Sequence, residues 1–98
     1  MNTLKKYEGV FIFIPNLEEE VRKAEMDKLK SIVESYKGTV EKFEEWGQRR
    51  LAYEIKKTKE GYYTLMNFTS EADAVNELDR ICKISEKVLR HMITKDEK

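Results

Sequence analysis

The chain has 98 residues, of which 39% are charged and 40% hydrophobic, and its 19 basic residues are balanced by 19 acidic residues. A chain of this size can bury one modest core, so we expect a single domain over residues 1–98. Zero net charge excludes the strongly basic class of nucleic-acid-binding proteins, and any such binding needs a local basic patch.

The first predicted strand covers residues 4–14. Apolar side chains lie on both of its faces, with Tyr7, Phe11 and Phe13 on one and Val10, Ile12 and Ile14 on the other. Apolar character on both faces is typical of a strand in the middle of a sheet. Pro15 then ends the strand.

A helix is predicted from Leu17 to Lys37, where apolar residues recur every three or four positions. Asn16 and Glu19 have the spacing of a capping box, so we expect Asn16 to cap the helix. Gly38 is suited to end it as a left-handed residue just past the last turn.

A second, long strand is predicted from Thr39 to Ile55, and Gly47 is a position where a bulge or bend can occur. A turn over residues 57–61 leads to a third strand from Tyr62 to Phe68. The short connection predicts that these two strands form an antiparallel hairpin.

A shorter amphipathic helix is predicted from Ala74 to Cys82. Ser70 and Asp73, three residues apart before this helix, have the spacing of a second capping box. Cys82 falls on the apolar side of this helix, which favours core packing over a reactive thiol.

The last strand is predicted from Val88 to about Thr94, followed by a flexible polar tail over residues 94–98. The resulting order is that of an α+β, ferredoxin-like βαββαβ plait, a four-stranded antiparallel sheet with two helices on one face. In this topology the first and third strands are central, and the second and fourth are edges, whose side chains and backbone are accessible.

The residues give no support for an enzyme, a cofactor or a small-molecule substrate. His91 has no obvious nucleophile beside it, and no glycine-rich phosphate loop follows the first strand. The acidic clusters at 18–20 and 41–45 are explained by helix capping and by strand solubility. One cysteine and one histidine exclude an internal disulfide and a histidine-rich metal site.

Membrane contact is not expected either. The longest apolar run, over residues 10–14, is far too short to cross a membrane. The N-terminal segment meets Glu8 before any apolar run, unlike a signal peptide. We therefore expect a cytoplasmic protein.

A basic segment follows the expected bulge in the second strand. Residues 49–59 contain five cations and a single acid, Glu54. The cations are Arg49, Arg50, Lys56, Lys57 and Lys59. Guanidinium groups suit phosphate or carboxylate recognition, because each offers a planar fork of donors. An ordinary strand with solvated arginines is the alternative, and nearby aromatic residues are equally well explained by core packing.

Several segments resemble the family of bacterial small-subunit ribosomal protein six, over about residues 4–95. The resemblance rests on Tyr7-Glu8, Pro15-Asn16, Trp46-Gly47-Gln48-Arg49-Arg50-Leu51-Ala52-Tyr53, Gly61-Tyr62-Tyr63 and Val88-Leu89-Arg90-His91. Residues 47–53 are its most specific part. The chain departs from the family at Glu54, where proline is common, and in lacking the long acidic tail of some members.

The resemblance implies a structural RNA-binding protein, without a cofactor. Members join the central domain of small-subunit ribosomal RNA as a heterodimer with ribosomal protein eighteen, which binds at a helical junction. By the match, the first candidates for contacts with RNA or partner are Arg49, Arg50 and Tyr53, followed by Lys5, Tyr7 and Arg90. The local run of cations adds Lys56 and Lys57 as candidates. The alternative is a non-ribosomal plait that acts as a protein-interaction or ligand-sensing module.

Overall fold

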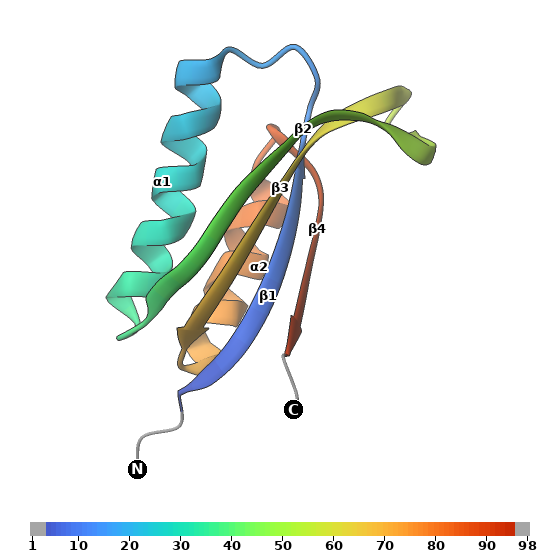
Figure 1. Ribbon diagram of the computed structural model, residues 1–98. Coiled ribbons are helices and arrows are strands. Elements are labelled where there is room, and N and C mark those ends of the chain that lie inside the picture. Colours follow the sequence, from blue (N-terminus) through green and yellow to red (C-terminus); the bar gives the residue numbers. More distant parts are fainter. Residues whose placement is uncertain (1–3, 96–98) are drawn as a thin grey trace.

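Six elements follow one another along residues 4–95, the part of the chain that the computed structural model describes. They are β1 (Lys5–Phe13), α1 (Glu19–Ser35), β2 (Thr39–Ile55), β3 (Thr58–Ser70), α2 (Ala72–Ile84) and β4 (Val88–Lys95). The strands form one sheet in the order β2-β3-β1-β4, and every neighbouring pair is antiparallel. Both helices cover the same face of this sheet (Figure 1). The predicted plait is confirmed, with β1 and β3 in the centre.

The main core fills the space between the sheet and the two helices. Its fully buried side chains come from every layer and include Phe11, Phe13, Leu29, Val33, Met66, Phe68 and Leu78. Cys82 also belongs to this core, as predicted, with 3% of its surface exposed. Burial of this apolar surface is the dominant favourable contribution to folding.

Both predicted capping boxes are wrong. Asn16 adopts a left-handed turn conformation with φ 63°, and α1 begins only at Glu19, after Glu18 as the residue that flanks it. Ser70 is the last residue of β3, and its hydroxyl donates to the Glu71 carbonyl, 3.1 Å away. Neither helix start has a side-chain cap. In both places the residue expected as the cap is used by the preceding turn or strand.

The end of α1 also differs from the prediction, because Lys37, with φ 61°, takes the left-handed position that was expected of Gly38. The Lys37 N–H donates to the Glu34 carbonyl (3.2 Å), and the Gly38 N–H donates to the Val33 carbonyl (2.9 Å). This pair of bonds is a Schellman motif. Gly38 is required there for space, since a Cβ would lie 2.5 Å from the Val33 oxygen and 2.6 Å from the Thr69 oxygen.

Replacing Gly38 by alanine is therefore expected to lower the free energy of unfolding by about 1–3 kcal/mol, as overpacking against fixed backbone does. Urea denaturation measures this change. Lys37→Gly is the matched control, because it relieves the left-handed backbone next to Gly38 and should leave stability unchanged or raised. If Gly38→Ala were as stable as the parent, the close approach of α1 to β3 would be contradicted.

The β2–β3 hairpin is longer and tighter than predicted. Ile55 pairs with Thr58, so the turn is formed by Lys56 and Lys57 alone, and β3 begins four residues before the predicted start. The register shifts at Gly47, which has φ 89°, and this confirms the expected bulge. At the other end of the chain, Thr94 and Lys95 belong to β4 and not to a tail, and residues 96–98 lie outside the described residues.

Candidate nucleic-acid interface

The second half of β2 lies at the edge of the sheet and presents its arginines on two faces. Arg49 pairs with Gly61 and Arg50 with Glu60, and both arginines are exposed. Since side chains alternate along a strand, Arg49 shares a face with Leu51 and not with Arg50. Leu51 is buried on the sheet face away from the helices, which we call the open face, so Arg49 belongs to that side.

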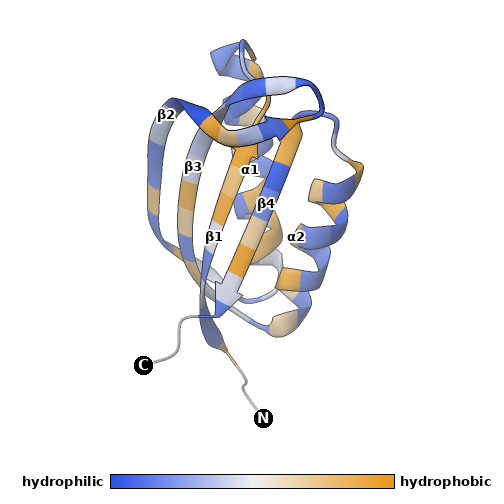
Figure 2. Ribbon diagram, turned by 90° about the vertical axis from the view of Figure 1, so that its right-hand side faces the viewer, coloured by the Kyte–Doolittle hydropathy of each residue, from blue (hydrophilic) through white to orange (hydrophobic). Residues whose placement is uncertain are grey.

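A shallow apolar groove of about 170 Å³ lies on the open face. We call it the open-face groove; its lining residues are Val10, Ile12, Leu51, Ala52, Tyr53, Ile55, Tyr63, Arg90 and Met92. The hairpin reaches across the end of the sheet toward β4 (Figure 2), and the Arg90 guanidinium donates a hydrogen bond to the Tyr53 hydroxyl. Tyr53 is 60% exposed and forms the polar rim of the groove.

Aromatic side chains extend the open-face groove along the hairpin. Trp46 and Tyr63 stack with ring centroids 6.5 Å apart and an angle of 15° between their planes. The Arg49 guanidinium lies 6.0 Å from the Trp46 ring, and its Nε donates to the Trp46 carbonyl oxygen at 3.4 Å. Trp46 is 41% exposed, so part of an aromatic face stays accessible beside an arginine.

The turn between β2 and β3 carries two lysines in strained backbone. Lys56 and Lys57 have φ 49° and 63°, the geometry of a two-residue turn that favours Asn-Gly. Positive φ is unfavourable for lysine, because its Cβ crowds the backbone. Strain of this kind gathers at functional positions, so the lysines are candidates for binding.

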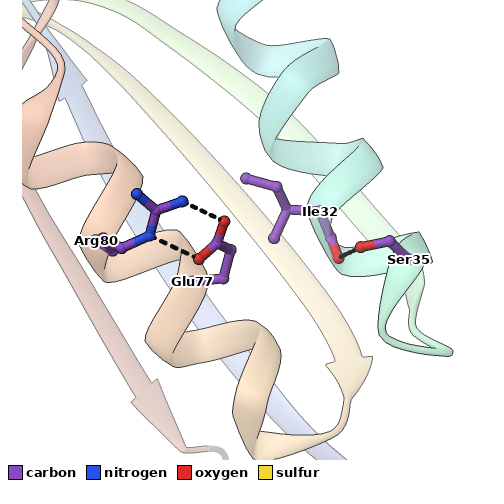
Figure 3. Close-up of polar contacts among 4 residues, drawn as sticks. All are labelled: Ile32, Ser35, Glu77 and Arg80. Atoms are coloured by element: carbon purple, nitrogen blue, oxygen red, sulfur yellow. Dashed lines mark hydrogen bonds and ion pairs between the residues drawn. The ribbon is translucent and has the colours of Figure 1, made fainter.

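Three cations of the helices, Lys23, Arg80 and Lys83, are paired with acids, whereas those of the hairpin are not, in the part of the chain that the structure describes. On α2, Arg80 donates two hydrogen bonds to Glu77, at 2.9 and 2.7 Å (Figure 3). The same figure shows a neutral contact near the end of α1, where the Ser35 hydroxyl donates to the Ile32 carbonyl. The Arg80 guanidinium also lowers the pKa of Glu77. Within residues 4–95, no ion pair joins an acid to any of the hairpin cations, which are Arg49, Arg50, Lys56 and Lys57.

Two of the predicted site residues lie elsewhere. Lys5 pairs with Ser70 at the start of β1, whereas Phe13 at its other end pairs with Tyr62 near the hairpin. Eight residues of strand separate the two ends of β1, about 26 Å. Tyr7 was a candidate contact residue, but it faces the helices, stacks on Phe68 at 5.5 Å and is 9% exposed. Its ring is a core component and is unavailable to a base.

The sequence prediction missed the apolar part of this surface. Ile12, Leu51 and Leu89 form a second buried cluster on the open face, and Met92 beside them is 45% exposed. A signal was present, since Val10, Ile12 and Ile14 gave the first strand a second apolar face. That pattern indicated a central strand, but it equally required some cover for the open face.

Two ionisable groups outside this surface, Asp79 and Cys82, have pKa shifts that their structural surroundings explain. The His91 Nε2 lies 2.6 Å from an Asp79 carboxylate oxygen, and Lys83 lies 2.9 Å from the other. These contacts, His91 first, lower the pKa of Asp79 and keep it ionised. Burial, with smaller contributions from Asp79 and Glu25, raises the pKa of the Cys82 thiol to about 12.

The Cys82 thiol is therefore expected to be inert. At pH 8 the reaction of the folded protein with an aromatic disulfide reagent should be about a thousand-fold slower than in urea, because the thiolate is the reactive form. The unfolded thiol ionises first as the pH rises, so the free energy of unfolding falls between about pH 9 and the folded pKa near 12 and does not recover above it. Rapid labelling of folded protein at pH 8 would contradict the buried, protonated thiol.

Neither a metal centre nor a membrane span is found in the part of the chain that the structure describes. Within residues 4–95, no group of three histidine, cysteine, aspartate or glutamate side chains is arranged to hold a metal ion. Neither of the two helices there has the length and apolar character needed to cross a membrane.

Comparisons with known proteins agree on one family. The family model described as ribosomal protein S6 matches residues 6–95. The small ribosomal subunit protein bS6 of Clostridium botulinum (strain 657 / Type Ba4) is 52% identical over 94 residues, which cover 96% of this chain and 100% of that protein. The protein of the same name from Alkaliphilus oremlandii is 54% identical over 95 residues, 97% of this chain and 100% of its own length.

A solved structure extends the agreement to three dimensions. The crystal structure of 30S ribosomal protein S6 from Thermotoga maritima superposes with a TM-score of 0.88 and 34% identity, covering 96% of this chain and 89% of that one. These matches overturn the alternative of a non-ribosomal module. The chain belongs to the ribosomal protein S6 family and is thus a non-enzymatic protein of the bacterial small ribosomal subunit, located with the ribosome in the cytoplasm.

Proposed function

We propose that this protein binds a helical junction in the central domain of small-subunit ribosomal RNA, as a heterodimer with ribosomal protein eighteen. The observation that carries the proposal is a grouping at the hairpin end of the sheet. There, around the apolar open-face groove, lie five of the cations singled out in the sequence: Arg49, Arg50, Lys56, Lys57 and Arg90. A basic rim suits RNA and an apolar groove suits a protein.

The RNA contacts are proposed for the hairpin cations. Arginine and lysine on a rigid sheet edge bind phosphates and fix the shape of a junction, and they read little base sequence. Arg50 points away from the open face, so we assign it to RNA. Arg49 lies on the open-face side next to Trp46, so we assign it to the boundary between RNA and partner protein.

The protein contact is proposed for the open-face groove. Its lining is mostly apolar, and the hydrogen bond between Arg90 and Tyr53 closes its rim. An apolar side chain of ribosomal protein eighteen in this groove would cover exposed Met92 and Tyr53. Burying such a patch is worth about 25 cal/mol for each Å² of apolar surface.

A filter-binding titration with a small-subunit junction RNA tests the proposal. The protein is titrated alone and as an equimolar mixture with ribosomal protein eighteen, at several salt concentrations. We expect salt-dependent binding that is tighter in the mixture, because the partner completes the surface. If neither the protein alone nor the mixture bound RNA more tightly at low salt than at high salt, the proposal would be wrong.

A variant of the strained turn is expected to be more stable than the parent and to bind RNA less tightly. Replacing Lys56 by asparagine and Lys57 by glycine should raise the free energy of unfolding by about 1 kcal/mol, because both residues accept positive φ. The same variant should bind junction RNA less tightly, because two cations are lost. Urea denaturation and filter binding measure the two effects; a gain in stability with unchanged RNA binding would remove the turn from the interface.

A further inference from the structure

A second groove lies at the opposite edge of the sheet, along the outer side of β4. It has a volume of about 310 Å³, and we call it the edge groove; its lining residues are Lys56, Cys82, Lys83, Val88, Leu89, Arg90 and His91. β4 is the last strand of the sheet, so among residues 4–95 its outer backbone has no strand partner. The groove therefore combines basic side chains with backbone donors of an edge strand.

The cations of the edge groove come from three separate elements. Lys56 belongs to the hairpin turn, Lys83 to the last turn of α2, and Arg90 to β4. Arg90 lines the open-face groove as well, where its guanidinium donates to Tyr53. None of the lining residues is acidic. Asp79 pairs with Lys83 at 2.9 Å and contacts His91 at 2.6 Å. Glu25, whose charge also acts on Cys82, pairs with Lys87 at 3.6 Å. With Lys87 included, four cations lie beside these two carboxylates, which leaves this site positive on a protein of zero net charge.

Asp79 also organises the helix side of the edge groove. Its two oxygens contact Lys83 and His91 separately, which orients both side chains on the wall between α2 and β4. Lys83 stays 68% exposed, so its ammonium group still has donors for a ligand. Lysine in the last turn additionally offsets the negative end of the α2 dipole, which would otherwise repel an anion.

We infer that the edge groove binds a backbone phosphate of RNA, as a contact separate from the arginines of β2. The inference rests on the proposed function, since it adds a second point of attachment for the same RNA. A compact anion beside cations from three separate elements fits this groove better than an extended acidic peptide, whose charges would lie in a line. β2 and β4 are separated by three strand spacings, about 14 Å, so RNA bound at both edges crosses the hairpin end of the sheet.

A charge-matched pair of variants tests the edge groove. Lys83→Gln removes a cation of the groove. Lys23→Gln removes one from α1 that has similar exposure (62% against 68%) and is likewise paired with an acid four residues away. With the junction RNA and ribosomal protein eighteen, Lys83→Gln should weaken binding about three- to ten-fold and lower the salt slope by about one unit. Lys23→Gln should change neither.

His91 provides an independent readout, because it is the only histidine of the chain. Its imidazole resonance in the NMR spectrum of the unmodified protein should shift on addition of RNA. The two comparison samples are sodium phosphate at the same ionic strength and ribosomal protein eighteen without RNA, and neither should reproduce the shift.

Each other outcome has a distinct meaning. If RNA binds but Lys83→Gln behaves like Lys23→Gln and the His91 resonance stays in place, the edge groove is not an RNA site and the proposed function stands. A shift with sodium phosphate alone would make it a site for free anions, and a shift with ribosomal protein eighteen alone would make it a protein contact; both overturn the inference. Absence of RNA binding by every form would instead contradict the proposed function itself.

Discussion

Replacing Arg49 and Arg50 together by alanine is expected to weaken binding of junction RNA by about 2 kcal/mol, roughly 30-fold, with little change in stability. Both side chains are exposed at the edge of the sheet and form no ion pair within residues 4–95, so the folded chain loses little when they are removed. Each phosphate contact removed should lower the slope of log affinity against log salt by about 0.7–0.9 units.

The control for the double arginine variant is the double variant Lys23→Ala, Lys28→Ala on the exposed side of α1. It changes net charge by the same amount, so any loss that is common to both variants is non-specific electrostatics. The single variants then separate the two arginines. Arg50→Ala should reduce the salt slope without ribosomal protein eighteen, whereas the effect of Arg49→Ala should grow when that protein is present. Equal losses in the arginine and lysine doubles would contradict a localised site.

Replacing Phe68 by alanine is expected to lower the free energy of unfolding by about 3–5 kcal/mol, the cost of a large cavity in a core. Phe68 is fully buried on the central strand β3 and stacks on Tyr7 at 5.5 Å. Domains of this size are stable by about 5–15 kcal/mol, so the variant should retain little of its stability. Urea denaturation at 25 °C measures the shift of the midpoint.

Met92→Ala is the matched control for Phe68→Ala, because it removes a large apolar side chain from the other face of the sheet. Met92 is 45% exposed in the open-face groove, and its loss should cost less than about 1 kcal/mol of stability. Its effect should appear instead in binding of ribosomal protein eighteen. If Met92→Ala destabilised the isolated protein as much as Phe68→Ala, the open face would be a core and not a docking surface.

The strand arrangement could be predicted from the sequence because it depends on long-range patterns. Two apolar faces identified β1 as central, and the order of the elements then gave β2 its place at the edge, with Gly47 at the bulge. These features follow from burial and connectivity, which determine the pattern of apolar residues along the sequence. The exposure of Arg49 and Arg50 followed from the edge position alone.

Local details could not be predicted, because competing interactions decide them. Asn16 has the chemistry of a cap, but the turn after β1 uses it at positive φ, and Lys37 takes the left-handed place because Gly38 is needed where α1 meets β3. Tyr7 became a candidate contact through the family resemblance, whereas its register opposite Phe68 places its ring in the core. The edge groove joins residues 56, 83 and 90, which no local pattern connects.

Amide NMR mapping in two steps tests the central claim most directly. Junction RNA is added first to labelled protein, and ribosomal protein eighteen second. We predict that RNA shifts the amides of residues 49–57 and the first half of β4, and that the partner then shifts those around Val10, Ile12 and Met92 on the open face. Shifts concentrated on the exposed sides of α1 and α2, with the hairpin end unchanged, would contradict the account.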